Sequence, residues 1–207
     1  MTGLRERKRA RTHAAISEAA IALFLERGFD EVSVAQVAEA AEVSKRTLFA
    51  YFAAKEDLVV HRFADHESEA ARVVRARPPD AEPLAALRDH FLDGLRRRDP
   101  ITGLNDVPEI LALTRMLLET PALRTRMIRF QQGAEQALAE ALQDTVGVPA
   151  LTARLAAVQV VGTSRLLLMD NSRALVGGQS ADERYPEAAA DAEHAFTVLS
   201  EGLAAYM

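Results

Sequence analysis

The stretch that decides the fold runs from Ser33 to Phe52 and reads SVAQVAEAAEVSKRTLFAYF. Ser33 and Ser44 each stand directly before a short run with helical spacing of apolar residues. A serine at that place caps a helix, because its hydroxyl accepts a hydrogen bond from a free backbone N–H of the first turn. The sequence therefore predicts two short helices joined by residues 41–43, which are the dimensions of a helix-turn-helix.

The second of these helices has the pattern of a recognition helix. Lys45, Arg46 and Thr47 at its start are polar, whereas Leu48 and Phe52 are apolar and would pack it on the preceding helix. A helix in the major groove reads base edges with the side chains of its N-terminal end. The alternative is a helical hairpin with a purely structural role, which this pattern alone also fits.

Outside this stretch, helical periodicity dominates and strand-like alternation is nearly absent, so we expect an all-α protein of about nine helices. Apolar spacing predicts a first helix near 11–27, closed by Gly28, and a long helix from Lys55 to the Pro78-Pro79 break. Pro83, Pro121, Pro149 and Pro186 fit the first turns of later helices. Those helices are expected near 83–97, 107–119, 121–145, 149–176 and 186–206.

Composition excludes several classes of protein. The 207 residues include no cysteine, which excludes disulfides, thiolate metal sites and thiol catalysis and fits a reducing cytoplasm. No uninterrupted apolar run reaches the roughly 18 residues of a spanning helix, so no membrane association is expected. The net charge is −5, but residues 1–62 carry ten Lys and Arg against nine Asp and Glu, so the acidic surplus lies wholly in the remainder.

The segment Ser33–Phe52, followed by Lys55-Glu56-Asp57-Leu58, strongly resembles the DNA-binding domain of TetR-family transcriptional regulators. The resemblance begins at Arg11 and fades near Arg62. It implies a DNA-binding domain over 1–54, with a basic tail at 1–10, and a helical effector-binding and dimerisation domain over 55–207.

The resemblance also implies which residues contact DNA. Lys45, Arg46 and Thr47 would face bases and neighbouring phosphates, and the others would contact the DNA backbone. The expected set is Ser33, Ser44, Lys45, Arg46, Thr47, Tyr51 and Lys55. Two positions depart from the family pattern: Glu42 replaces a common glycine in the turn, and Phe49 replaces a tyrosine whose hydroxyl would reach phosphate.

For the second domain, the resemblance implies a homodimer formed by the last two long helices and a pocket for a small-molecule effector of unknown identity. The helix near 149–176 is too apolar for an ordinary surface helix, which fits a dimer. Gly162 permits either a close helix approach or a local widening, and the sequence leaves both open. The residues expected to line the pocket, which are equally suited to an ordinary core, are Leu113, Met116, Leu117, Met127, Phe130, Gln131, Thr163 and Met169.

The densest group of possible acid, base or metal-binding residues is His61, Asp65, His66 and Glu67, but it matches no known metal or catalytic motif. We therefore expect no catalytic residues, metal or cofactor. The sequence favours a cytoplasmic, non-enzymatic repressor that binds a palindromic double-stranded operator as a dimer and is released by the effector. The alternative is an all-helical enzyme or ligand-binding protein without a role at DNA.

Overall fold

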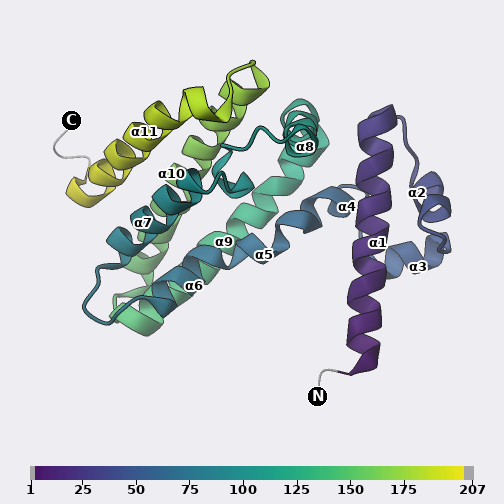
Figure 1. The fold of residues 1–207 in the computed structure, drawn as a ribbon. Coiled ribbons are helices and arrows are strands. Elements are labelled where there is room, and N and C mark those ends of the chain that lie inside the picture. Colours follow the sequence, from purple (N-terminus) through teal and green to yellow (C-terminus); the bar gives the residue numbers. More distant parts are fainter. Residues whose placement is uncertain (1–2, 203–207) are drawn as a thin grey trace. The chain divides into compact units, whose positions relative to one another are not determined.

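The computed structural model describes residues 3–202, and all regular structure in that range is helical (Figure 1). The elements in chain order are α1 (Leu4–Arg27), α2 (Val34–Ala40), α3 (Lys45–Tyr51), α4 (Asp57–Val60), η1 (His61–Phe63), α5 (Ala64–Glu67), α6 (Glu69–Ala76), α7 (Pro83–Arg96), η2 (Pro100–Thr102), α8 (Pro108–Glu119), α9 (Pro121–Val146), α10 (Ala150–Val176) and α11 (Ala181–Glu201). If the run from α4 to α6 is taken as one interrupted helix, the described residues form nine main helices. The predicted all-α class is confirmed.

The chain forms two compact units. One consists of Met1–Ala64 with Arg115–Ile128, and the other of Asp65–Thr114 with Arg129–Met207. The first unit therefore extends beyond the boundary at residue 54 expected from sequence, and it includes parts of α8 and α9. Helix α9 is continuous and contributes residues to both units.

The first unit is organised around α1. This helix starts at Leu4, so most of the segment expected to be a basic tail is helical, while residues 1 and 2 lie outside the described range. Gly28 ends the helix as predicted, with a positive φ of 94° and its N–H donating to the carbonyl of Phe24. The core of the unit is made of buried apolar side chains from α1 to α4, namely Ile16, Ala20, Phe24, Phe29, Val32, Val37, Ala38, Leu48, Phe52, Leu58 and Val59.

The long helix expected from Lys55 to Arg77 is interrupted twice. A 3-10 turn at η1 follows α4, and Ser68 separates α5 from α6. Arg72 stabilises the second interruption, because its guanidinium donates hydrogen bonds of 2.8 Å to the carbonyl of Asp65 and to Ser68 Oγ. The prediction of an uninterrupted helix was wrong, since these contacts support a break that apolar spacing does not reveal.

In the second unit, α11 packs along α7 and α10 (Figure 1). A buried polar cluster lies between α11 and α10 around Arg184, which is only 7% exposed. Its guanidinium donates to Asn171 Oδ1 at 3.0 Å and forms ion pairs of 2.6 Å with Asp191 and Glu187. Asn171 in turn donates to the carbonyl of Thr102 at 3.0 Å. The cluster therefore ties α11, α10 and η2 together.

Helix α11 begins five residues earlier than predicted. Ser180 and Glu183 form a capping box, in which Ser180 Oγ accepts from the Glu183 N–H and the Glu183 carboxylate accepts from the Ser180 N–H. Pro186, expected in the first turn, lies inside the helix. The predicted end at 206 lies outside the described residues.

Helix α10 is long and apolar enough to cross a membrane by length and composition alone, although only 22% of its most apolar window is buried in the protein. One face of α10 packs in the second unit through Ala153, Ala157 and Val160. The opposite face leaves four large apolar side chains exposed, with Leu151 at 66% and Leu155 at 54%. The four are Leu151, Leu155, Val158 and Leu166. This uncovered face accounts for the low burial.

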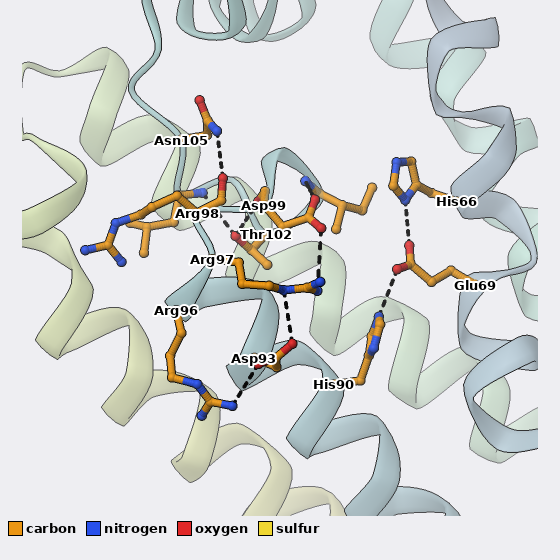
Figure 2. A network of polar contacts seen from close by, with 12 residues as sticks. His66, Glu69, His90, Asp93, Arg96, Arg97, Arg98, Asp99, Thr102 and Asn105 are labelled. Carbon is orange, nitrogen blue, oxygen red and sulfur yellow. Dashed lines mark hydrogen bonds and ion pairs between the residues drawn. The ribbon is translucent and has the colours of Figure 1, made fainter. Parts of the chain in front are cut away.

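A carboxylate held by two histidines joins α5, α6 and α7. Figure 2 shows Glu69 between His66 and His90, with contacts of 2.6 Å to His66 Nδ1 and 2.8 Å to His90 Nε2. The hydrogen bond from His90, followed by that from His66, lowers the pKa of Glu69 from 4.5 to about 2, although burial opposes the shift. The ionised carboxylate is therefore the form that stabilises this junction.

This pKa shift predicts acid sensitivity of the second unit. Because the pKa of Glu69 is lower in the folded chain, its contribution to stability is complete above pH 4.5 and is lost as the pH falls toward 2. We expect the free energy of unfolding, measured by urea titration between pH 6 and pH 3, to fall more steeply in the wild type than in Glu69→Gln. Parallel curves for the two proteins would contradict this role.

Candidate nucleic-acid interface

The first helix of the predicted motif, α2, begins as the sequence indicates. Ser33 Oγ accepts from the Gln36 N–H at 3.3 Å, and the Gln36 side chain accepts from the Ser33 N–H at 2.8 Å. This capping box satisfies two backbone donors of the first turn. The Ser33 hydroxyl also donates to Gln36 Oε1 at 2.8 Å, so it is already engaged within the protein.

The turn between the two helices is left-handed at Glu42, where φ is 53°. The Val43 N–H closes the turn by donating to the carbonyl of Ala38 at 2.9 Å. A side chain in this conformation costs about 1 kcal/mol more than glycine, because its Cβ crowds the backbone. The turn therefore keeps, with a glutamate, the left-handed conformation that a glycine would adopt at lower cost.

The second helix, α3, presents two distinct faces. Ser44 caps it by accepting from the Thr47 N–H at 3.0 Å, and the hydroxyls of Ser44 and Thr47 lie 2.7 Å apart. Leu48 and Phe52 are buried at 1% and 2% exposure, and they anchor the helix on the core of the first unit.

The opposite face of α3 is open. Lys45 and Arg46 are exposed, and neither takes part in an ion pair within the described part of the chain. Phe49 lies on the same side, one turn further on, and is 46% exposed. Phe49 is therefore more than a tyrosine that lacks its hydroxyl, because its spacing from Lys45 and Arg46 places it on their face. The open face thus combines two free cations with one apolar ring.

Tyr51, at the end of α3, lies beside α1. Its ring is 6.0 Å from that of His13, and the guanidinium of Arg9 is 5.9 Å from its centroid. The ring of His13 also meets that of His61 edge to face, with their centroids 3.7 Å apart, and a shallow recess of about 340 Å³ opens beside these side chains. Burial, then the proximity of His61 and Arg9, lowers the pKa of His13. These surroundings favour the neutral form of the imidazole over the charged one.

Lys55 is directed toward the interior of the first unit. Its ammonium donates to the carbonyl of Phe29 and lies 4.4 Å and 5.5 Å from the ring centroids of Phe29 and Phe24. An ammonium over aromatic faces gains cation–π attraction. Lys55 thus links the segment after α3 to the residues at and just after the end of α1.

The residues expected to line an effector pocket are distributed over both units. Met116, Leu117 and Met127 belong to the first unit, and Leu113, Phe130, Gln131, Thr163 and Met169 belong to the second. Leu113 and Met116 are buried, whereas the others are partly exposed. Gln131 donates to Glu135 Oε1 at 3.1 Å.

The acid and histidine group singled out in the sequence does not form one site. His61 contacts the ring of His13 edge to face, and His66 bonds Glu69. Glu67 rests against Gly133 of α9, where an added Cβ would come within 1.7 Å of its carboxylate oxygen. Across residues 3–202, no three His, Cys, Asp or Glu side chains are grouped so that they could hold a metal ion.

Two short capped helices, joined by a left-handed turn and presenting free cations at the start of the second, define a helix-turn-helix DNA-binding protein. A family model described as "Bacterial regulatory proteins, tetR family" matches residues 16–61. Residues 16–61 of the chain are therefore a DNA-binding domain of this family.

Two curated relatives of the chain are named as transcriptional regulators. TcmR of Streptomyces glaucescens is 33% identical over 147 residues, which cover 70% of this chain and 65% of that protein. The putative mycofactocin biosynthesis regulator MftR of Mycobacterium tuberculosis is 28% identical over 143 residues, 65% of each chain. The chain thus spans 65% of the length of these curated relatives.

Solved structures share the fold over nearly the whole chain. NalD, the secondary repressor of the MexAB-OprM multidrug efflux pump in Pseudomonas aeruginosa, has a TM-score of 0.54 at 22% identity, covering 93% of this chain and 96% of that one. GusR of Salmonella enterica has a TM-score of 0.56 at 18% identity, covering 92% and 94%. The likeness includes the helical second unit, which the family model does not reach.

Proposed function

We propose that this protein is a cytoplasmic transcriptional repressor that binds a palindromic double-stranded operator as a homodimer and is released by a small-molecule effector. The observation that carries the proposal is the open face of α3, where Lys45 and Arg46 are exposed and free of ion pairs. An exposed pair of cations at the start of a helix that is anchored from behind is what reading a major groove requires.

Within this proposal, Lys45 and Arg46 contact base edges, with Arg46 suited to a bidentate contact with guanine. Phe49 adds an apolar surface for a thymine methyl group. Phosphates would be contacted by Ser33, Ser44, Thr47, Tyr51 and Lys55. The serine and threonine hydroxyls and the Lys55 ammonium already have partners in the protein, so they would offer DNA only their remaining hydrogen-bonding capacity.

The first test concerns Arg46. We expect Arg46→Ala to weaken binding to the operator by about 1 to 3 kcal/mol and to relax the base preference at one position of each half-site. Mobility shifts on DNA upstream of the protein's own gene, with single-base operator variants, measure both effects. Arg96→Ala, which removes an exposed arginine of α7, serves as the control. If Arg46→Ala leaves operator affinity unchanged, Arg46 does not contact the bases.

The same experiment separates the alternatives. A ligand-binding protein or an enzyme without a role at DNA would not shift this fragment, whereas a dimeric regulator produces a complex of two chains per operator. A wild-type protein that fails to distinguish the upstream fragment from random DNA would contradict the proposed function as a whole.

We assign the dimer contact to α10 and α11, the last two long helices. Support comes from the uncovered face of α10, whose four exposed apolar side chains repeat at helical spacing. Gly162 lies within this row, and a Cβ added there would meet no atom within 4 Å, so a second helix has room to approach. A two-fold dimer also matches the symmetry of a palindrome, in which recognition helices about 34 to 36 Å apart enter successive major grooves.

The effector is proposed to bind within the second unit, among the partly exposed residues of the predicted set that belong to it, namely Phe130, Gln131, Thr163 and Met169. Flexible methionine and aromatic side chains adapt to varied apolar ligands. Binding would release DNA only if the effector favours a dimer in which the recognition helices no longer match the operator spacing.

A further inference from the structure

The turn between α3 and α4 is held by one carboxylate with two partners. Asp57 Oδ2 accepts from the Ala54 N–H at 3.0 Å, which closes the turn immediately after the recognition helix. The guanidinium of Arg126 forms a bidentate ion pair with the same carboxylate, with Nε 2.5 Å from Oδ1 and Nη2 2.7 Å from Oδ2. These three residues all belong to the first unit.

The pair is sheltered from solvent. The side chains of Arg126 and Asp57 are only 24% and 19% exposed, unlike the half-exposed arginine pairs elsewhere on the surface. A bidentate arginine–carboxylate contact fixes orientation as well as distance, and water screens it little when it is partly buried. The contact therefore defines where the α3–α4 turn lies relative to α9.

The segment that receives this contact has little freedom of its own. Phe52, which directly follows α3, is buried, and only two alanines and Lys55-Glu56 separate it from Asp57. Leu58 and Val59, which follow Asp57, are fully buried. A displacement of the Asp57 carboxylate would therefore also displace the end of the recognition helix, because only a few residues lie between them.

Arg126 lies on α9, close to the point where this helix passes from the residues of the first unit to those of the second. A helix is stiff along its axis, because every turn is closed by backbone hydrogen bonds. Because Arg126 is part of α9, it moves together with the helix, and no flexible loop lies between them.

We propose that Arg126 is a positioning residue for DNA recognition: through Asp57 it holds the α3–α4 turn, and hence the recognition helix, in the orientation that the operator requires. This inference rests on the proposed operator binding. It assigns Arg126 no contact with DNA.

The test compares Arg126→Gln with Arg124→Gln, an exposed arginine of the same helix. At a temperature where circular dichroism shows both variants fully folded, we expect Arg126→Gln to lower operator affinity about tenfold. Arg124→Gln should change it less than twofold. The salt dependence of operator binding should keep its wild-type slope in Arg126→Gln, because no phosphate contact is lost. A reduced slope would show that Arg126 touches DNA and would overturn the positioning role.

A double-mutant cycle tests whether Arg126 affects operator binding through its contact with Asp57. Asp57→Asn retains an oxygen for the Ala54 N–H but removes the charge that holds Arg126. If the two side chains act as one contact, the double variant binds operator about as well as the weaker single variant. Hydrogen exchange should quicken over residues 52–60 in Arg126→Gln and stay unchanged in α7.

Besides a reduced salt slope, three results would overturn the inference: wild-type affinity in Arg126→Gln, additive losses in the cycle, or a loss of affinity that only follows the unfolded fraction. A wild-type protein that does not bind the operator would instead contradict the proposed function, so the two failures are distinguishable.

Discussion

Leu155→Glu on α10 is expected to turn the protein into a monomer and to lower operator affinity by at least about 100-fold, equivalent to about 2.7 kcal/mol. Leu155 is 54% exposed in the single chain and lies within the uncovered apolar face of α10. In the proposed dimer this side chain is buried against the second copy, and a carboxylate there would lose its hydration without a partner. A monomer would also have to bind each half-site separately, without the gain from a linked second site.

Sedimentation equilibrium and mobility shifts measure the two expected effects. Val107→Glu provides the control, because Val107 is a similarly exposed apolar residue, at 48%, outside α10. That variant should remain a dimer and bind the operator normally. A Leu155→Glu protein that stays dimeric would place the dimer contact elsewhere.

Arg184→Ala is expected to lower the free energy of unfolding by about 3 kcal/mol, because it removes the centre of the polar cluster between α10 and α11. The change leaves Asn171 Oδ1 without its donor, and Asn171 is only 2% exposed. It also leaves a cavity where the arginine stem packed. Urea denaturation followed by circular dichroism gives the magnitude.

The matched control for this second prediction is Arg173→Ala. Arg173 is 63% exposed and pairs with Asp170 on the surface of α10, the helix that carries Asn171. Exposed pairs contribute little, so the loss there should stay below about 1 kcal/mol. Equal losses in the two variants would show that the buried cluster has no special share in stability.

The helix-turn-helix could be predicted from sequence because its signals are local. Ser33 and Ser44 cap helices as expected, since the hydroxyl and the N–H it accepts from lie three residues apart. The same holds for Gly28 at the end of α1. These interactions need no information about distant segments, and the family resemblance covers the same residues.

The features that sequence did not reveal depend on distant partners or on competing local signals. The inward orientation of Lys55 depends on Phe24 and Phe29, which precede it by about thirty residues. At α11 the capping box of Ser180 and Glu183 was present in the sequence, but the proline at 186 suggested a later start. A proline inside a helix removes one backbone hydrogen bond, and here the cap outweighs that loss.

For the same reason, the local features of the candidate site could be predicted from sequence, whereas its contacts with distant residues could not. The exposure of Lys45 and Arg46 follows from helical spacing within α3, and so does that of Phe49. The pairing of Asp57 with Arg126 joins residues 69 positions apart and leaves no local pattern. Apolar composition indicated candidates for an effector pocket but not which of them belong to the same unit.

The continuity of α9 has a thermodynamic consequence. Residues of this helix up to Ile128 belong to the first unit and those from Arg129 to the second. Helix formation is cooperative, so disordering one half exposes new ends in the other and weakens it. Melting of either unit therefore destabilises the other through the shared helix. The division of the chain is a division of contacts, while the folding of its two parts is energetically coupled.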